Sequence, residues 1–244
     1  MNRTLVKQGN LIDYGDAFEV NPLALQRRFD TIHNIFSPEF SFLDNGTHFQ
    51  TKNLMFHFHK LLDTDAGRGP KQVVTLFKEF LKLKSQAQKE YADYIQQRLG
   101  DYSIPDRTQE ALRYTQLQAK FLEKPSKDLL VQQAWKTEAL FCNALSGAQA
   151  EFFGNYHTAY GWAQKAVEAT QQYQAATAQL ANKHKSNKDY QKFMDYEKAY
   201  GEFLEEGTSA QLAKATSEFG KGEHKSPPLS PQLRIANTIQ DYLA

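Results

Sequence analysis

Residues 127–180 read KDLLVQQAWKTEALFCNALSGAQAEFFGNYHTAYGWAQKAVEATQQYQAATAQL, and they carry the clearest fold signal in the chain. Apolar and small side chains recur in them every three or four positions, the spacing that places side chains on one face of an α-helix. Two interpretations fit this stretch: a single helix of about 55 residues, about 80 Å long, or two helices hinged near Gly147 or Gly154. An interior glycine costs about 1 kcal/mol relative to alanine, which does not by itself break a helix, so both stay open.

The rest of the chain favours the same fold class. Valine and isoleucine are scarce, whereas leucine, alanine, glutamine, glutamate and lysine, which lose little rotamer freedom in a helix, are plentiful. Pro70 opens a strong helical pattern that Gly100 ends, and Pro105 opens the next, which ends before Pro125. Ser126 is the predicted cap of the helix that follows. We therefore expect an all-α bundle with long helices, at least five in number.

The C-terminal part of the body predicts two further helices. Residues 182–187 are polar and predict a turn. A helix containing Tyr190 to Leu204 follows it. A separate short helix is expected from Ser209 to Phe219.

Changes in composition predict four regions along the chain. Residues 1–69 form a phenylalanine-rich extension, with an irregular arm before Asn21 and short helices starting at Asn21 and over residues 51–63. Residues 70–220 form the helical body. Residues 221–231 are a proline-rich linker, and residues 232–244 are an amphipathic segment that the linker tethers.

Charge and cysteine content limit the classes of function. The chain has 244 residues and a formal net charge of +1, whereas nucleic-acid binders usually carry a basic excess, so we expect no nucleic-acid partner. Its single cysteine, Cys142, rules out an intramolecular disulfide and is typical of a reducing compartment. The chain shows neither a secretory signal nor an apolar run of transmembrane length, so we expect a cytoplasmic protein that reaches a membrane only indirectly, through a complex.

No motif predicts catalysis, a metal or a cofactor. Residues 67–71 read GRGPK, which lacks the Gly-Lys-Ser/Thr ending of a phosphate-binding loop. Cys142 lies on an apolar stripe, so we expect a buried structural thiol. Tyr156 and Tyr160 have small neighbours, which favours close helix packing over a cofactor pocket. A zinc site needs about four converging ligands, and no second ligand pair accompanies the four histidines of the first region, His33, His48, His57 and His59.

The leading functional prediction is a non-enzymatic protein–protein adaptor or scaffold subunit of a multiprotein complex. Its predicted partner-binding residues form the apolar face of the last segment: Leu233, Ile235, Ile239, Tyr242 and Leu243. The alternative for this segment is docking back on the bundle, because a short helix alone is marginal in water. Two other functions stay open: a secreted effector or regulator that binds a foreign protein, and an enzyme with a dispersed site. Polar side chains converging in a pocket would favour the enzyme, and a large exposed apolar patch would favour the adaptor.

The composition resembles that of a known class of proteins. A helical chain rich in glutamine, lysine and phenylalanine, with Gln171-Gln172 and Lys183-His184-Lys185, is similar to accessory or adaptor subunits of bacterial type IV secretion coupling complexes. The resemblance implies a cytoplasmic protein that binds other subunits and helps to recruit substrates. The spacing from Tyr156 to Tyr173 also resembles a tetratricopeptide helix, without the 34-residue repeat of that family. A long helix would also suit a curved membrane-binding dimer, but the concave basic face of such a dimer is not evident.

Overall fold

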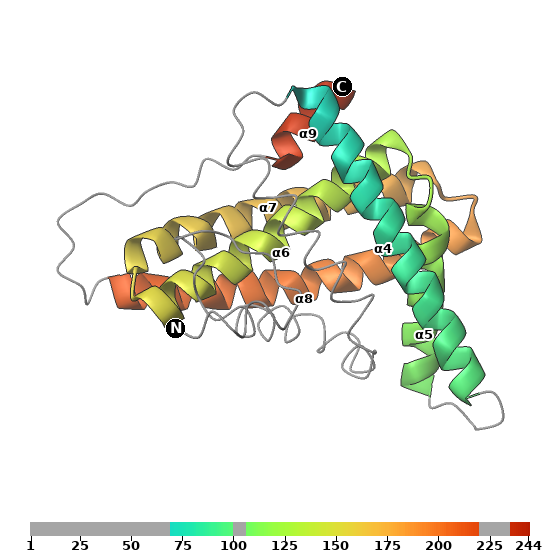
Figure 1. The fold of residues 1–244 in the computed structure, drawn as a ribbon, viewed down its shortest axis with the longest axis horizontal. Coiled ribbons are helices and arrows are strands. Elements are labelled where there is room, and N and C mark those ends of the chain that lie inside the picture. The colour runs from blue at the N-terminus through green and yellow to red at the C-terminus, as the bar shows by residue number, and fades with distance from the viewer. Residues whose placement is uncertain (1–68, 100–105, 220–234) are drawn as a thin grey trace, which may run out of the picture.

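The computed structural model describes residues 69–99, 106–219 and 235–244, and all of its regular elements in these ranges are α-helices (Figure 1). The predicted all-α class is therefore confirmed. The predictions for residues 1–68, for the linker at 221–231 and for Leu233 lie outside the described residues. The described helices are α4 (Pro70–Leu99), α5 (Asp106–Leu122), α6 (Lys127–Phe153), α7 (Tyr156–Lys183), α8 (Lys188–Phe219) and α9 (Ile235–Leu243).

Three long helices lie side by side, and a helical hairpin crosses them (Figure 1). The helices α6, α7 and α8 run along the long axis of the molecule, with α7 packed against both of the others. The α4–α5 pair lies across one end of these three helices and extends beyond them. The short α9 packs on α4 and α6, so the last described residues are part of the bundle.

The long helical stretch is broken at Gly154, which settles the choice between one helix and two. Gly154 has a φ of 60°, in the left-handed region that favours glycine, and its N–H donates to the carbonyl of Gln149. The next residue, Asn155, caps α7 by accepting a hydrogen bond from the Thr158 N–H. Gly147 lies inside α6 and is buried. The left-handed residue and the cap together end one helix and start the next, which an interior glycine alone does not do.

The prediction of two helices after residue 187 was wrong, because α8 continues without a break from Lys188 to Phe219. The predicted boundary fell between Leu204 and Ser209, where Gly207 has a low intrinsic helix propensity. Leu204 and Thr208, on either side of Gly207, are both buried, and packing of that kind outweighs a cost of about 1 kcal/mol. The turn before α8 lies at residues 184–186, inside the predicted range.

The helix α6 is the centre of the bundle. Ser126 caps it as predicted, by accepting a hydrogen bond from the Leu129 N–H. From Gln132 to Gly147 every residue of α6 is buried, so this helix has no solvent-exposed face over more than four turns. Because the buried run includes Gln132, Lys136 and Glu138, the core must supply hydrogen bonds to polar groups.

Candidate functional site

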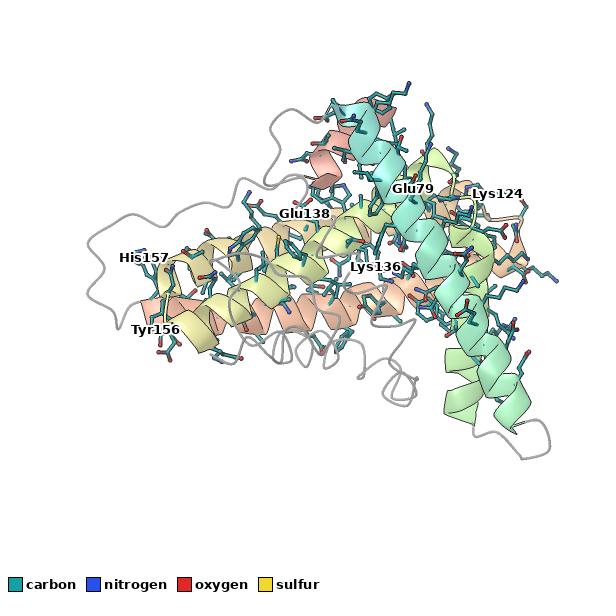
Figure 2. All side chains as sticks on the ribbon, in the orientation of Figure 1. Glu79, Lys124, Lys136, Glu138, Tyr156 and His157 are labelled. Atoms are coloured by element: carbon teal, nitrogen blue, oxygen red, sulfur yellow. The ribbon has the colours of Figure 1, made fainter. Side chains whose placement is uncertain are left out.

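A buried ion pair joins Lys136 of α6 to Glu197 of α8, and several other buried polar side chains form hydrogen bonds with it. The Lys136 Nζ lies 2.9 Å from Glu197 Oε1, and the two side chains are 2% and 0% exposed. Figure 2 shows Lys136 inside the bundle, where α4 crosses the long helices. Two charges so far from solvent persist only when each is paired and hydrogen-bonded, so their neighbours decide what the pair can do.

Side chains from three helices donate hydrogen bonds to the Glu197 carboxylate, in addition to those from Lys136. The Tyr114 hydroxyl of α5 donates to Oε1 over 2.6 Å. The Tyr173 hydroxyl of α7 reaches Oε2 at 2.9 Å and also the Glu197 carbonyl at 2.7 Å. From α6, the amides of Gln132 and Gln133 donate to Oε2 over 2.9 and 3.0 Å. Both carboxylate oxygens are thus fully engaged by groups of the chain itself.

The Lys136 ammonium is equally well satisfied. Its Nζ donates to the Tyr114 hydroxyl over 2.8 Å and to both oxygens of Glu197. It also lies 3.9 Å from the centre of the Tyr200 ring, which supplies a cation–π contact. The Tyr114 hydroxyl in turn accepts a hydrogen bond from Gln118. We call these seven residues, with Tyr200 as an aromatic wall, the buried polar cluster: Tyr114, Gln118, Gln132, Gln133, Lys136, Tyr173 and Glu197.

Electrostatics keeps the cluster in one protonation state near neutral pH. Burial would raise the pKa of Glu197, but Lys136 and the hydrogen bonds from Tyr114, Lys136 and Gln132 outweigh it and lower the pKa to about 2. Burial lowers the pKa of Lys136 and Glu197 opposes this; because the ammonium donates hydrogen bonds to three acceptors, we assign the pair as ionised. Burial and then Glu197 raise the pKa values of Tyr114 and Tyr173 well above 10.0.

One further lysine lies in the field of this ion pair. Lys84 of α4 is half-buried, and burial and the charge of Lys136 lower its pKa to about 7, although Glu197 opposes the shift. No described side chain pairs with its ammonium at ion-pair distance. The Glu197 charge therefore acts on both lysines, and Lys136 is the one that forms an ion pair with it.

The side chains of the buried polar cluster do not line the grooves beside it. One groove lies between α6, α7 and α9 and another between α4 and α5, and no member of the cluster lines either of them. Every donor and acceptor of Lys136 and Glu197 is used within the chain. The arrangement therefore connects α5, α6, α7 and α8 through one hydrogen-bonded network, in which Lys136 and Glu197 neutralise each other.

The C-terminal segment docks on its own bundle. Ile239 is fully buried and Leu243 packs against the same hydrophobic core, while Tyr242 is 48% exposed. Ile235 begins α9, and Leu233 lies outside the described residues. Of the two alternatives for this segment, the structure shows α9 docked on the bundle, so Ile239 is not available as a surface anchor while α9 is docked. Partner binding by these residues stays a prediction.

A groove runs beside α9. It has a volume of about 470 Å³ and lies between α6, α7 and α9. Val131, Leu180 and Leu243 contribute apolar side chains, and the small Ala175 and Ala176 lie on its α7 side. Its charged lining residues are Lys127, Asp128 and Lys183, and the last two form an ion pair between α6 and α7.

A second groove, of about 450 Å³, lies between α4 and α5. Lysines and carboxylates alternate along it, with Lys82, Lys89, Asp93 and Glu123 among its lining residues. Because both signs of charge are present and these side chains are exposed, the groove selects no ligand class by charge.

Some of the remaining sequence predictions concern residues that the structure describes, and others concern residues outside the described ranges. Cys142 is fully buried as expected, and burial raises the pKa of its thiol well above 9.0. The ring of Tyr160 lies 5.3 Å from that of Phe219, so α7 and α8 pack closely there, at the end of the bundle that Figure 2 marks with Tyr156 and His157. The four histidines of the first region lie outside the described residues. Among the residues that are described, no three His, Cys, Asp or Glu side chains converge as metal ligands would.

No protein family, curated protein or solved structure matches the chain. The resemblance to accessory subunits of type IV secretion coupling complexes therefore stays a prediction. None of the described helices is both long enough and apolar enough to cross a membrane.

Sequence reasoning missed the buried polar cluster, although a signal was present. Glu197 shares its predicted helical face with Tyr190, Phe193 and Leu204, which are all buried. A carboxylate in phase with an apolar stripe must find a cation or a set of donors in the core. The periodicity identifies such a residue, but its partner Lys136 lies 61 positions away and no local pattern names it.

Proposed function

We propose that this chain is a non-enzymatic protein–protein adaptor or scaffold subunit, and that its partner contacts the α9 end of the bundle. The observation that carries the proposal is the closed state of the buried polar cluster. Its ionised pair, Lys136 and Glu197, is hydrogen-bonded within the chain, and the cluster lines neither of the two grooves described above. A buried cluster of this kind stabilises the packing of the helices, so we expect the partner protein to bind residues on the surface of the bundle.

The α9 end is the part of the described surface best suited to a protein partner. Tyr242 is the large apolar side chain that is exposed among the described residues, and tyrosine is enriched at the centres of interfaces. The groove between α6, α7 and α9 combines apolar side chains with a charged rim. The small side chains of Ala175 and Ala176 would let another helix approach closely. The described surface shows no broad flat apolar patch, so the proposed contact is a groove with an aromatic residue nearby.

The resemblance stated above suggests a specific form of the proposal, in which the partner is another cytoplasmic subunit of a secretion-related complex. Such a subunit would reach a membrane only through the complex. An effector that binds a foreign protein would use the same surface, and the identity of the captured partner distinguishes the two.

The experiment is affinity isolation with a matched pair of variants, followed by reconstitution. Ala175→Arg places a long charged side chain in the groove at an exposed position of α7, and Ala210→Arg makes the same change at an exposed position of α8 outside the groove. Proteins that co-purify with the chain are quantified by mass spectrometry. The partner is then purified and mixed with each variant in size-exclusion chromatography.

The proposal expects one or a few partners at near-stoichiometric amounts, which form a complex with the native chain and with Ala210→Arg but not with Ala175→Arg. A partner retained equally by both variants would move the contact away from the groove. Failure to reconstitute any stoichiometric complex would refute the adaptor function.

A further inference from the structure

The surface beneath α9 is formed by apolar side chains of α4 and α6. We call it the α4–α6 groove, and in this subsection "the groove" means this surface. Ala236 and Ile239 of α9 are both fully buried. They belong to one hydrophobic cluster that also contains side chains of α4 and α6, namely Val73, Val74, Phe77, Leu130, Ala134 and Trp135. Ala236, Ile239 and Leu243 stand at positions i, i+3 and i+7, so α9 presents a single apolar stripe to this groove.

Two polar contacts show that the groove accepts a helix in one orientation. The Glu138 carboxylate of α6 is 4% exposed, and its Oε2 accepts a hydrogen bond of 2.8 Å from the Ala236 N–H. Backbone N–H groups are free of helical partners in the first turn of a helix, and a carboxylate there also interacts favourably with the helix dipole. The Trp135 Nε1 donates over 2.9 Å to the side chain of Gln240, one turn further along α9. Figure 2 shows Glu138 on the α9 side of α6.

The helix α9 is too short to hold its conformation without the groove. It has nine residues, whereas isolated helices below roughly 12–15 residues are marginal in water. Its secondary structure therefore depends on docking. Residues 220–234 separate α9 from α8 along the chain, and its described helix contacts are chiefly with α4 and α6.

We propose that the groove between α4 and α6 is a helix-binding site that α9 occupies in cis, and that an amphipathic helix of the partner protein takes its place. This inference rests on the proposed adaptor function. The occupant is defined by what α9 presents: a small residue, a β-branched apolar residue and leucine at i, i+3 and i+7, a hydrogen-bond acceptor at i+4, and a free helix N-terminus for Glu138. The docked α9 thereby limits access to the site.

Tethering makes the cis state dominant over a free ligand. A segment covalently joined to its own binding site competes at an effective concentration that can reach the order of millimolar, so a micromolar helix competes poorly until α9 is released. A change that weakens α9 without altering α4 or α6 should therefore raise the affinity of the groove for a helix supplied in trans.

The test uses a fluorescein-labelled synthetic peptide of residues 232–244 as the probe and fluorescence anisotropy as the readout. The full-length Ile239→Asp variant places a charge at the buried position of α9 and leaves the groove intact. The matched control is Tyr242→Asp, which places the same charge on the exposed face of the same helix. Ile239→Ala is a milder release variant, and Ile239→Asp combined with Trp135→Phe removes the indole donor from the groove.

The peptide should bind the Ile239→Asp chain at least ten-fold more tightly than the native chain, with Ile239→Ala between them and Tyr242→Asp within two-fold of native. Trp135→Phe in the released chain should weaken binding by roughly two- to ten-fold, the value of one hydrogen bond. Absence of peptide binding to a folded Ile239→Asp chain would overturn the inference. So would cooperative loss of the whole circular dichroism signal in both Ile239 variants, because α9 would then be an inseparable part of the core. The probe needs no natural partner, so a failed partner search leaves this result unaffected.

Discussion

Replacing Glu197 with glutamine should destabilise the fold by about 3–5 kcal/mol, because the substitution keeps the shape of the side chain and removes its charge. The Lys136 ammonium, 2% exposed, would stay in the core without a counter-ion. Breaking a buried pair in this way typically costs about 3–5 kcal/mol. The pKa of Glu197 is lowered from 4.5 to about 2, and a difference of this size corresponds to about 3 kcal/mol of preference for the ionised form. The typical cost of breaking a buried ion pair and the preference derived from the pKa of Glu197 are therefore of the same size.

The assay is urea unfolding followed by circular dichroism, with thermal unfolding as a second measurement. A loss of this size should lower the Tm by roughly 10 °C in a chain of this length. Glu206→Gln is the matched control, since Glu206 is an exposed carboxylate on the same helix, and it should change the free energy of unfolding by less than about 0.5 kcal/mol.

A double-mutant cycle identifies the cause. Lys136→Met combined with Glu197→Leu removes both charges and should recover part of the lost stability. Recovery should be incomplete, because the Tyr114 hydroxyl loses its acceptor on Glu197, whereas Tyr173 keeps the Glu197 carbonyl. A Glu197→Gln variant whose free energy of unfolding lies within 1 kcal/mol of the native value would refute the reasoning. So would a double variant whose loss of stability equals the sum of the losses in the Lys136→Met and Glu197→Leu single variants.

Four other predictions concern pH and the backbone. Because the folded-state pKa of Glu197 is lowered from 4.5 to about 2, the unfolded chain binds more protons in that window; urea midpoints should fall as the pH drops from 4.5 toward 2, and this dependence should weaken in Glu197→Gln. Burial raises the pKa values of Tyr114 and Tyr173 well above 10.0, so the folded chain keeps these protons longer, and stability measured by the same assay should fall as the pH rises above 10. Gly207→Ala should stabilise the chain by about 0.5–1 kcal/mol, because an added Cβ on this helical residue meets no atom within 4 Å. Gly154→Ala should destabilise it by about 1–2 kcal/mol, since φ is 60° there; equal Tm values for the two glycine variants would contradict both expectations.

The predicted helices held up best where the signal was local. Pro70 and Ser126 mark real helix starts, and the polar stretch at 182–187 contains the turn before α8. Each of these boundaries depends on side chains within one turn of the chain, through missing or supplied hydrogen bonds of the helix end. The break expected between Leu204 and Ser209 was wrong, because α8 continues through it with Leu204 and Thr208 buried, and a local pattern does not show that burial.

The candidate site was predictable only in fragments. The amphipathic face of residues 232–244 was visible in the sequence, yet whether Ile239 would be an anchor or a core residue was left open. The outcome depends on a complementary surface that α4 and α6 create more than 90 residues earlier in the chain. The same holds for Glu197, whose position on an apolar stripe marked it as unusual without naming Lys136 or the tyrosines around it.

Periodicity and composition alone were enough to predict the helices and their approximate ends, because helical hydrogen bonds connect residues four apart and therefore depend on neighbouring side chains. The sequence also contains no linear catalytic motif. The continuity of α8, the buried polar cluster and the docking of α9 required the packed bundle. Each of these features depends on groups that are distant in sequence and near in space, and on a core in which a charge or an apolar stripe is stable only opposite its complement.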